Sequence, residues 1–227
     1  MTVLETRIDE LRQKLFKMAA IVEKMTAASM AALVGRRADE ARRVIDEEEP
    51  KVNDLEIEIE NDAINLIALH QPEASNLRTI VMAIKINNDL ERIGDHAVNI
   101  AQAAEFLVQR PEVKPLVDLP RMSDEAIRML ADSLDAFARG DAELAEGVCR
   151  RDELVDSLRS QINRELVTYM AGDGATIDRA LKLMLIARNL ERIADLATNI
   201  AEDAIYMAKG RVIKHYAEEA EEPASGS

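Results

Sequence analysis

The chain has 227 residues, a formal net charge of −14 and a pI of about 4.8. This acidity argues against free nucleic acid as a partner, because phosphate contacts need a basic surface. Aromatic residues make up 3% of the chain, and there is no tryptophan. Sheets favour aromatic and β-branched residues, whereas the abundant alanine, leucine, glutamate and arginine favour helices. We therefore expect an all-α protein.

The single cysteine, Cys149, cannot form an internal disulfide and is predicted to be a small core residue. Residues 1–11 carry four charges and lack the apolar segment of a signal peptide. We find no uninterrupted run of about 18 apolar residues, the length that spans a membrane. A cytoplasmic protein is expected, with a membrane role that is only peripheral.

The first long segment has apolar or small residues at alternating steps of four and three between Leu4 and Ala32. This heptad pattern predicts a long helix with one narrow buried face, which ends at Gly35. A short polar stretch leads into a second predicted helix. Proline cannot continue a helix interior, so Pro72 is expected to end the second helix.

A third helix is predicted from about Ser75 to about Gln109. Three prolines follow, at Pro111, Pro115 and Pro120. Proline-rich stretches of this kind interrupt regular structure, which predicts a linker between two halves. Ser123, followed by two acidic residues, is predicted to be the N-cap of the next helix.

The second half of the chain repeats the first. Residues 90–101 read LERIGDHAVNIA and residues 190–201 read LERIADLATNIA, with nine of twelve positions identical. Three helices with short connections favour an up-down-up bundle in each half. The prediction is two tandem pseudo-symmetric three-helix bundles, with six long antiparallel helices. The predicted segments are 1–110 and 122–216 for the bundles, 111–121 for the proline-rich linker and 217–227 for a disordered acidic tail.

Each repeat carries two acidic residues four positions apart, which places them one turn apart on one helix face. The second helix of each half should run antiparallel to the third, and it carries a similar pair at the same height. Each half is therefore predicted to gather four oxygen-bearing side chains. The eight residues are Glu49, Asn53, Glu91, Asp95, Asp152, Asp156, Glu191 and Asp195.

Oxygen ligands suit hard or intermediate cations such as magnesium, manganese, iron or calcium, and zinc is a further candidate. Helical periodicity places the acidic pairs opposite the buried stripe, so a surface groove is expected. The alternative is a solvated acidic face without a ligand. None of the three histidines, His70, His96 and His215, has the spacing of a di-iron centre. Surface or interhelical hydrogen-bonding roles are predicted for them.

The two LERI[GA]D…NIA copies, the Arg151-Asp152-x-x-Val155-Asp156 segment and the Gln71-Pro72…Leu77-Arg78 turn resemble the PhoU family of phosphate-specific transport system accessory proteins. The resemblance covers about residues 4–215. It implies two three-helix bundles side by side, commonly in a homodimer. It also implies metal binding through E(D)xxxD(N) motifs, which fall on the eight residues named above.

The resemblance further implies a negative regulator of the phosphate-starvation response, which restrains that response when phosphate is plentiful and modulates phosphate uptake. The implied partners are the phosphate-sensing histidine kinase and the ATPase subunit of the phosphate ABC transporter, at the inner face of the membrane. Four departures from the family pattern stand out. Asn53 and Asn76 replace acidic residues, Ala194 stands where the first copy has Gly94, and the second half lacks the Pro-x-x-x-x-Leu-Arg turn.

Two alternative functions stay open on the sequence. One is a metal-dependent enzyme, such as a carboxylate-bridged oxidase or a phosphohydrolase. The other is a phosphate sensor in which a bound cation mediates anion binding. The chain shows no Ser/His/Asp set, no zinc-ligand spacing and no dinucleotide fingerprint. A regulatory protein that binds partners, rather than an enzyme, is therefore the favoured interpretation.

Overall fold

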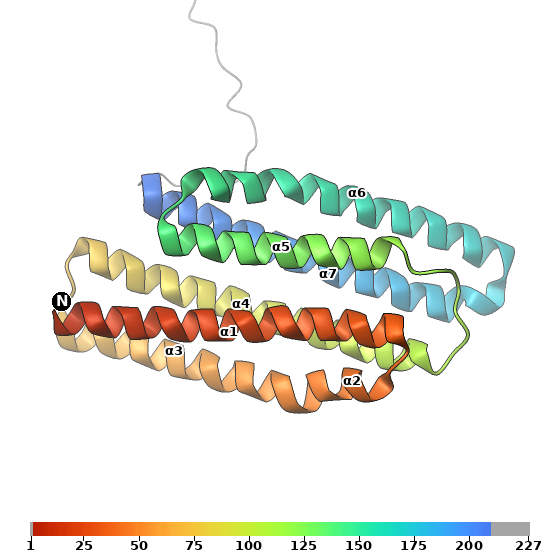
Figure 1. Ribbon diagram of the computed structural model, residues 1–227, viewed down its shortest axis with the longest axis horizontal. Coiled ribbons are helices and arrows are strands. Elements are labelled where there is room, and N and C mark those ends of the chain that lie inside the picture. The colour runs from red at the N-terminus through yellow and green to blue at the C-terminus, as the bar shows by residue number, and fades with distance from the viewer. Residues whose placement is uncertain (1, 210–227) are drawn as a thin grey trace, which may run out of the picture.

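The computed structural model describes residues 2–209, and all regular structure in this range is helical (Figure 1). The helices are α1 (Val3–Gly35), α2 (Ala38–Arg43), α3 (Glu49–His70), α4 (Ala74–Val108), α5 (Asp118–Arg139), α6 (Ala142–Gly172) and α7 (Ile177–Lys209). A π-helical segment, η1 (Val44–Glu48), joins α2 to α3, and a 3₁₀ turn, η2 (Gly174–Thr176), joins α6 to α7. The predicted all-α fold is confirmed. The predicted acidic tail, 217–227, lies outside the described residues.

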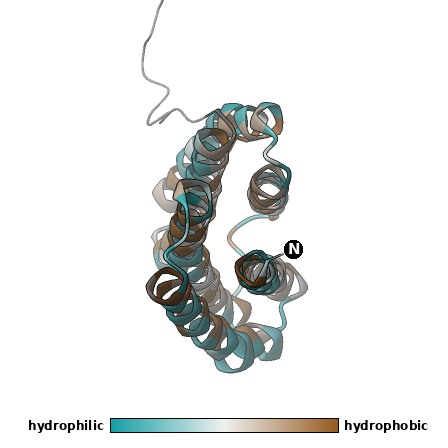
Figure 2. Ribbon diagram, turned by 90° about the vertical axis from the view of Figure 1, so that its left-hand side faces the viewer, coloured by the Kyte–Doolittle hydropathy of each residue, from teal (hydrophilic) through white to brown (hydrophobic). Residues whose placement is uncertain are grey.

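Four helices lie side by side as a curved layer in the order α3, α4, α7, α6 (Figure 2). Helices α1 and α5 pack on the concave side of this layer and contact each other. The convex side is not covered by any helix of the described residues. Helices α4 and α7 therefore form the centre of the molecule, where the two halves meet.

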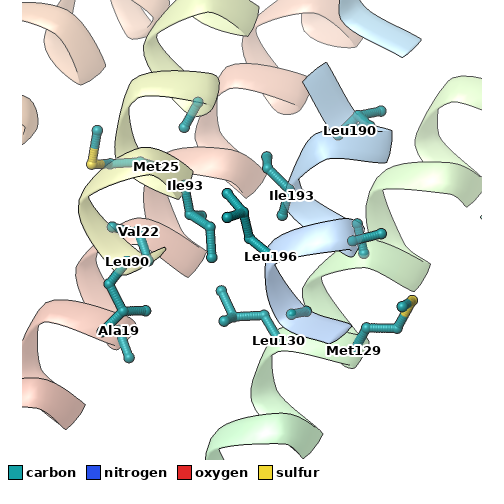
Figure 3. Close-up of a cluster of buried hydrophobic side chains, with 14 of the residues drawn as sticks. Ala19, Val22, Met25, Leu90, Ile93, Met129, Leu130, Leu190, Ile193 and Leu196 are labelled. Carbon is teal, nitrogen blue, oxygen red and sulfur yellow. The ribbon is translucent and has the colours of Figure 1, made fainter. Parts of the chain in front are cut away.

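Buried side chains from both halves form one hydrophobic cluster. Figure 3 shows Ile93 of α4, Leu196 of α7 and Leu130 of α5 pointing toward one another, with Val22 of α1 behind Ile93. Because side chains of both halves meet there, the two repeats share one core instead of forming two separate ones. Full burial of each large aliphatic side chain in it contributes roughly 1.5–3 kcal/mol.

Helix α1 is fixed at both ends. At its start, Thr2 Oγ1 accepts a hydrogen bond from the Glu5 N–H (3.2 Å), and the Glu5 carboxylate accepts one from the Thr2 N–H (2.7 Å). This is a capping box. After its end, Arg36 adopts a left-handed backbone conformation (φ 54°). The Arg36 guanidinium donates to the carbonyl oxygens of Val108 (2.7 Å) and Arg110 (2.6 Å), so it caps the end of α4.

By length and composition, α1 is the one helix of residues 2–209 that could cross a membrane, although half of its most apolar window is buried inside the protein. The core helix of a soluble protein passes the same test. Helix α1 packs against α3, α4 and α5. These contacts account for its apolar character, and we describe it as a core helix.

The π-helical segment arises from Pro50. Pro50 has no N–H, so it cannot donate to the carbonyl of Asp46, and its ring would crowd that carbonyl in a regular α-helix. The helix instead widens into a π turn, in which the Glu49 N–H donates to the carbonyl oxygen of Val44, five residues back. This irregular turn lies directly before Glu49, one of the predicted site residues.

Helix α5 begins earlier than predicted. Its first residue is Asp118, so Pro120 lies in its first turn, where a missing N–H costs no helical hydrogen bond. The prediction that Ser123 is an N-cap is wrong, since Ser123 lies inside the helix and is 2% exposed. Pro120 therefore does not interrupt regular structure as predicted, because proline is tolerated in the first turn of a helix.

The connection before α5 is held against the second half. Arg179 of α7 donates from its guanidinium to the carbonyl oxygen of Pro111 (2.7 Å). Lys114 forms an ion pair with Glu165 of α6. Together with the contact from Arg36 to Arg110, these bonds fix the connection to α1, α6 and α7.

Glu23 of α1 is partly buried where the two halves meet, and its neighbour across that contact is Asp135 of α5. Burial, and then the Asp135 charge, raise the pKa of Glu23. A carboxyl whose pKa is raised by folding stabilises the protein while protonated, and this stabilisation is lost as pH rises through the folded-state pKa. Glu23→Gln is therefore expected to increase the free energy of unfolding at neutral pH.

Denaturant titrations of the wild type and Glu23→Gln at neutral pH and below the ordinary glutamate pKa of 4.5 test this expectation. The difference in the free energy of unfolding between Glu23→Gln and the wild type should shrink in acid, where wild-type Glu23 is protonated. Glu153→Gln, at an exposed site on α6, serves as the control. An equal effect of Glu23→Gln at both pH values would contradict the assignment.

Candidate functional site

The predicted carboxylates of the second half are close to one another. Burial, followed by the charges of Asp195, Asp156 and Glu191, raises the pKa of Asp152 to about 6. These four residues come from α6 and α7, as the antiparallel arrangement predicts. Like charges held at short range disfavour ionisation, which is why the pKa of Asp152 is raised.

The predicted residues of the first half are arranged differently. Burial, and then the charges of Asp95 and Glu56, raise the pKa of Glu91. Glu56 of α3 was not selected from the sequence, although it lies one turn beyond Asn53 on the same helix. Asn53 is exposed, and Glu49 is partly buried at the first position of α3.

Two arginines of the second half neutralise the predicted site residues there. Arg159 Nη1 lies 2.8 Å from Glu191 Oε1 and donates to Oε2 at 3.0 Å. Arg192 Nη1 lies 2.9 Å from Asp195 Oδ2. Glu191 is 8% exposed, which contradicts the expectation that these residues all face a surface groove. Arg159 comes two helical turns after Asp152, on the same face of α6.

The repeat places Arg159 at the position that Glu56 occupies in the first half, because Val155 and Ile162 correspond to Val52 and Ile59. In the first half Glu56 occupies this position and repels the Glu91 carboxylate of α4. In the second half Arg159 occupies it and pairs with the Glu191 carboxylate of α7. Equivalent positions of the two halves therefore have opposite electrostatics.

A groove of about 620 Å³ is lined by residues of α4, α6 and α7. Its lining residues are Arg92, His96, Cys149, Asp152, Arg192, Asp195, Leu196, Thr198, Asn199 and Glu202. Of the eight predicted residues, Asp152 and Asp195 line this groove. Two basic side chains from the repeated motif, Arg92 and Arg192, flank it. The groove therefore has mixed charge.

His96 bridges the two halves next to this groove. Asn189 donates from Nδ2 to the carbonyl oxygen of Leu185 (2.8 Å), so its Oδ1 is the atom that accepts from His96 Nδ1 (2.9 Å). Burial lowers the pKa of His96, which favours the neutral imidazole. The interhelical hydrogen-bonding role predicted for His96 is therefore observed. His215 lies outside the described residues.

Cys149 packs against the hydrophobic core, as predicted, and is also partly exposed at the groove. Burial, and then the charge of Glu202, raise the pKa of its thiol to about 11. The thiolate is the reactive form of cysteine, so a thiol with this pKa is a poor nucleophile at neutral pH.

The predicted metal ligands are oxygen-bearing side chains. Carboxylate oxygens are suitable donors for a hard cation. Within residues 2–209, however, no group of three or more His, Cys, Asp or Glu side chains lies close enough to hold a metal ion. Arginine ion pairs on Glu191 and Asp195 already supply positive charge there. The donors fit a cation chemically, but the side chains as placed do not form a closed site.

The fold defines a class of protein: a duplicated helical bundle that presents charged side chains on an open layer of four helices. The family model described as "PhoU domain" matches residues 15–104 and 119–204. The chain belongs to the PhoU family.

Similar proteins cover almost the whole chain. A "Phosphate-specific transport system accessory protein PhoU homolog" of Aquifex aeolicus is 41% identical, over 92% of this chain and 94% of the relative. A homolog of the same name from Caulobacter vibrioides is 43% identical, over 82% of this chain and 81% of the relative.

Two crystal structures share the fold. PhoU from Pseudomonas aeruginosa has a TM-score of 0.88 and 36% identity, covering 91% of this chain and 99% of that protein. The "phosphate transport system regulatory protein PhoU" from Streptococcus pneumoniae has a TM-score of 0.85 and 27% identity, covering 93% and 100%. The family consists of regulatory accessory proteins, not enzymes, so the enzyme alternative is dropped.

The pair formed by Arg159 and Glu191 gives a stability prediction. Arg159→Leu leaves a buried carboxylate beside other acids, and we expect a loss of about 1–3 kcal/mol in the free energy of unfolding. Adding Glu191→Gln should recover most of this loss, because the unpaired charge disappears.

Denaturant titration measures both effects. Arg192→Leu is the matched control, because its pair with Asp195 is more exposed and should be worth less than about 1 kcal/mol. If Arg159→Leu cost no more than Arg192→Leu, the buried pair would have no special structural role.

Proposed function

We propose that this protein is a negative regulator of the phosphate-starvation response. It contacts the phosphate-sensing histidine kinase and the ATPase subunit of the phosphate ABC transporter, restrains the response when phosphate is plentiful and modulates phosphate uptake. The names of its relatives, accessory and regulatory proteins of phosphate transport, support this proposal. The observation that carries it is the duplicated layer. Each repeat contributes one surface to its convex side, and the two surfaces share a backbone arrangement but differ in charge.

The same proposal places the protein in the cytoplasm, where its partners recruit it to the inner face of the membrane. An adaptor of this kind acts by binding, so it needs two surfaces and no catalytic residues. A homodimer, as implied by the family resemblance, would double the number of these surfaces.

The regulatory proposal is tested in cells that carry a reporter for phosphate-starvation genes. Deletion of the gene is expected to raise reporter expression several-fold at high phosphate, and the wild-type gene should restore repression. A reporter that stays silent at high phosphate after deletion would refute negative regulation. Affinity capture with purified kinase and purified transporter ATPase then identifies which partner binds.

We further propose that the second-half carboxylates, Asp152, Asp156, Glu191 and Asp195, bind a divalent cation such as magnesium or manganese, or an iron-type cation. The raised pKa of Asp152 supports the proposal, because a cation would relieve the repulsion that causes it. Binding requires Arg159 and Arg192 to leave the carboxylates with which they pair. The first-half set lacks one charge, at Asn53, and is expected to bind more weakly.

Metal analysis of the purified protein tests this second proposal. The variant Asp152→Asn/Asp156→Asn is expected to lose at least half of the bound metal, whereas Glu91→Gln/Asp95→Asn should lose less. Circular dichroism shows whether each variant is folded. If the wild-type protein holds no metal after dialysis against each cation, the metal has no part in the mechanism. Calorimetry with phosphate, with and without the cation, then tests the metal-mediated phosphate sensor.

A further inference from the structure

The convex side of the first half carries an exposed apolar patch close to the turn between α3 and α4. Ile64 is 52% exposed, and Leu77 and Val81 are 38% and 39% exposed. We call these three residues the first-half patch. Asn87 Nδ2 of α4 donates to the carbonyl oxygen of Glu56 of α3 (3.0 Å), which fixes the antiparallel register. In that register Ile64 lies near the level of Val81.

The patch faces the same way as the carboxylates of α4. Val81 and Asp95 are separated by whole helical turns, so both lie on the side of α4 that points away from α1. The buried stripe of α4, which includes Ile86, Leu90 and Ile93, lies on the opposite side. Among the described residues no helix covers the patch.

The second half repeats the patch in shape but not in charge. Val167, Ile177 and Leu181 occupy the repeat positions of Ile64, Leu77 and Val81, and they are 52%, 42% and 52% exposed. We call them the second-half patch. Their neighbours include Arg164 and Arg188, which stand at the positions of Asn61 and Asn88 in the first half.

The first-half patch is bordered by acids. Glu60 and Glu56 of α3 lie one and two turns before Ile64, respectively, and Glu91 lies further along α4. None of these three carboxylates forms an ion pair within residues 2–209, and the Glu56 charge helps to raise the pKa of Glu91. In the second half the corresponding residues are Arg159, Asn163 and Glu191, and Arg159 neutralises Glu191.

We propose that the first-half patch docks a basic amphipathic helix of a partner protein, and that the second-half patch does not accept it. Exposed apolar anchors and unpaired carboxylates complement a helix with an apolar stripe flanked by lysine or arginine. The proposal rests on the proposed function as an adaptor, and it adds the contact surface and the charge of the partner segment. The duplication gives one chain two docking surfaces of similar shape that select by charge.

A synthetic helix tests this proposal with the purified full chain. The probe is a fluorescent peptide of about 18 residues, five helical turns, with leucine on one face and lysine on the flanks. The control peptide has glutamate in place of lysine. We expect the lysine peptide to bind with a stoichiometry of one per chain and the glutamate peptide not to bind at the first-half patch.

Three variants locate the site. Val81→Glu is expected to weaken lysine-peptide binding about tenfold, although it adds negative charge, because it removes an apolar anchor. Leu181→Glu is the matched control at the repeat position and should leave binding unchanged. Glu56→Arg gives the first half the charge of the second and should also weaken binding about tenfold. Val81 and Leu181 are exposed, and the second repeat already has an arginine, Arg159, at the position of Glu56. All three variants should therefore fold.

Equal effects of Val81→Glu and Leu181→Glu, or no effect of either, would overturn the proposal, since binding would then be unspecific attraction to an acidic protein. Sedimentation of the wild type and Val81→Glu provides a second criterion. If the variant loses an oligomer that the wild type forms, a second copy of the chain covers the patch and the proposal fails. The reporter experiment is independent, so failure of the docking proposal is distinguishable from failure of the regulatory one.

Discussion

The packing of α4 against α7 is the contact on which the rest of the structure depends. Ile93, Leu196 and Leu130 close the core between the two halves, so each three-helix repeat completes its neighbour's interior (Figure 3). The hydrogen bond from His96 to Asn189 and the ion pair between Lys85 and Asp203 set the register of this contact. With the two central helices side by side, α1 and α5 fill the concave side, and no helix of residues 2–209 covers the convex side.

The two repeats keep a common backbone but differ at the side chains that matter for binding. A Cβ atom at Gly94 would lie 3.2 Å from Cγ1 of Val52, so glycine permits close packing of α4 on α3. At the equivalent place the second repeat has Ala194, which is fully buried. The exchange of Glu56 for Arg159 has a larger effect, because it turns a repulsive contact into an attractive one without changing the helix.

Helix periodicity and the internal repeat were sufficient to predict the fold, since both depend on local spacing along the chain. The turn near Pro72 also allowed the first-half site residues to be placed at one height, and the turn at residues 172–174 did the same for the second-half carboxylates. Three features could not be found in this way. The π turn at Pro50 and the early start of α5 depend on how proline fits particular helix positions. The burial of Glu191 depends on Arg159, a contact between two helices that the spacing within either one does not specify.

The ion pairs on Glu191 and Asp195 also affect how the protein meets other molecules in solution. They cancel much of the negative charge at one end of the convex face, while Glu56, Glu60 and Glu91 leave the other end uncompensated. An uneven charge distribution of this kind gives the molecule a dipole, which orients it during diffusional encounter. Association with a cationic protein would therefore begin at the first repeat and would slow as salt screens the field.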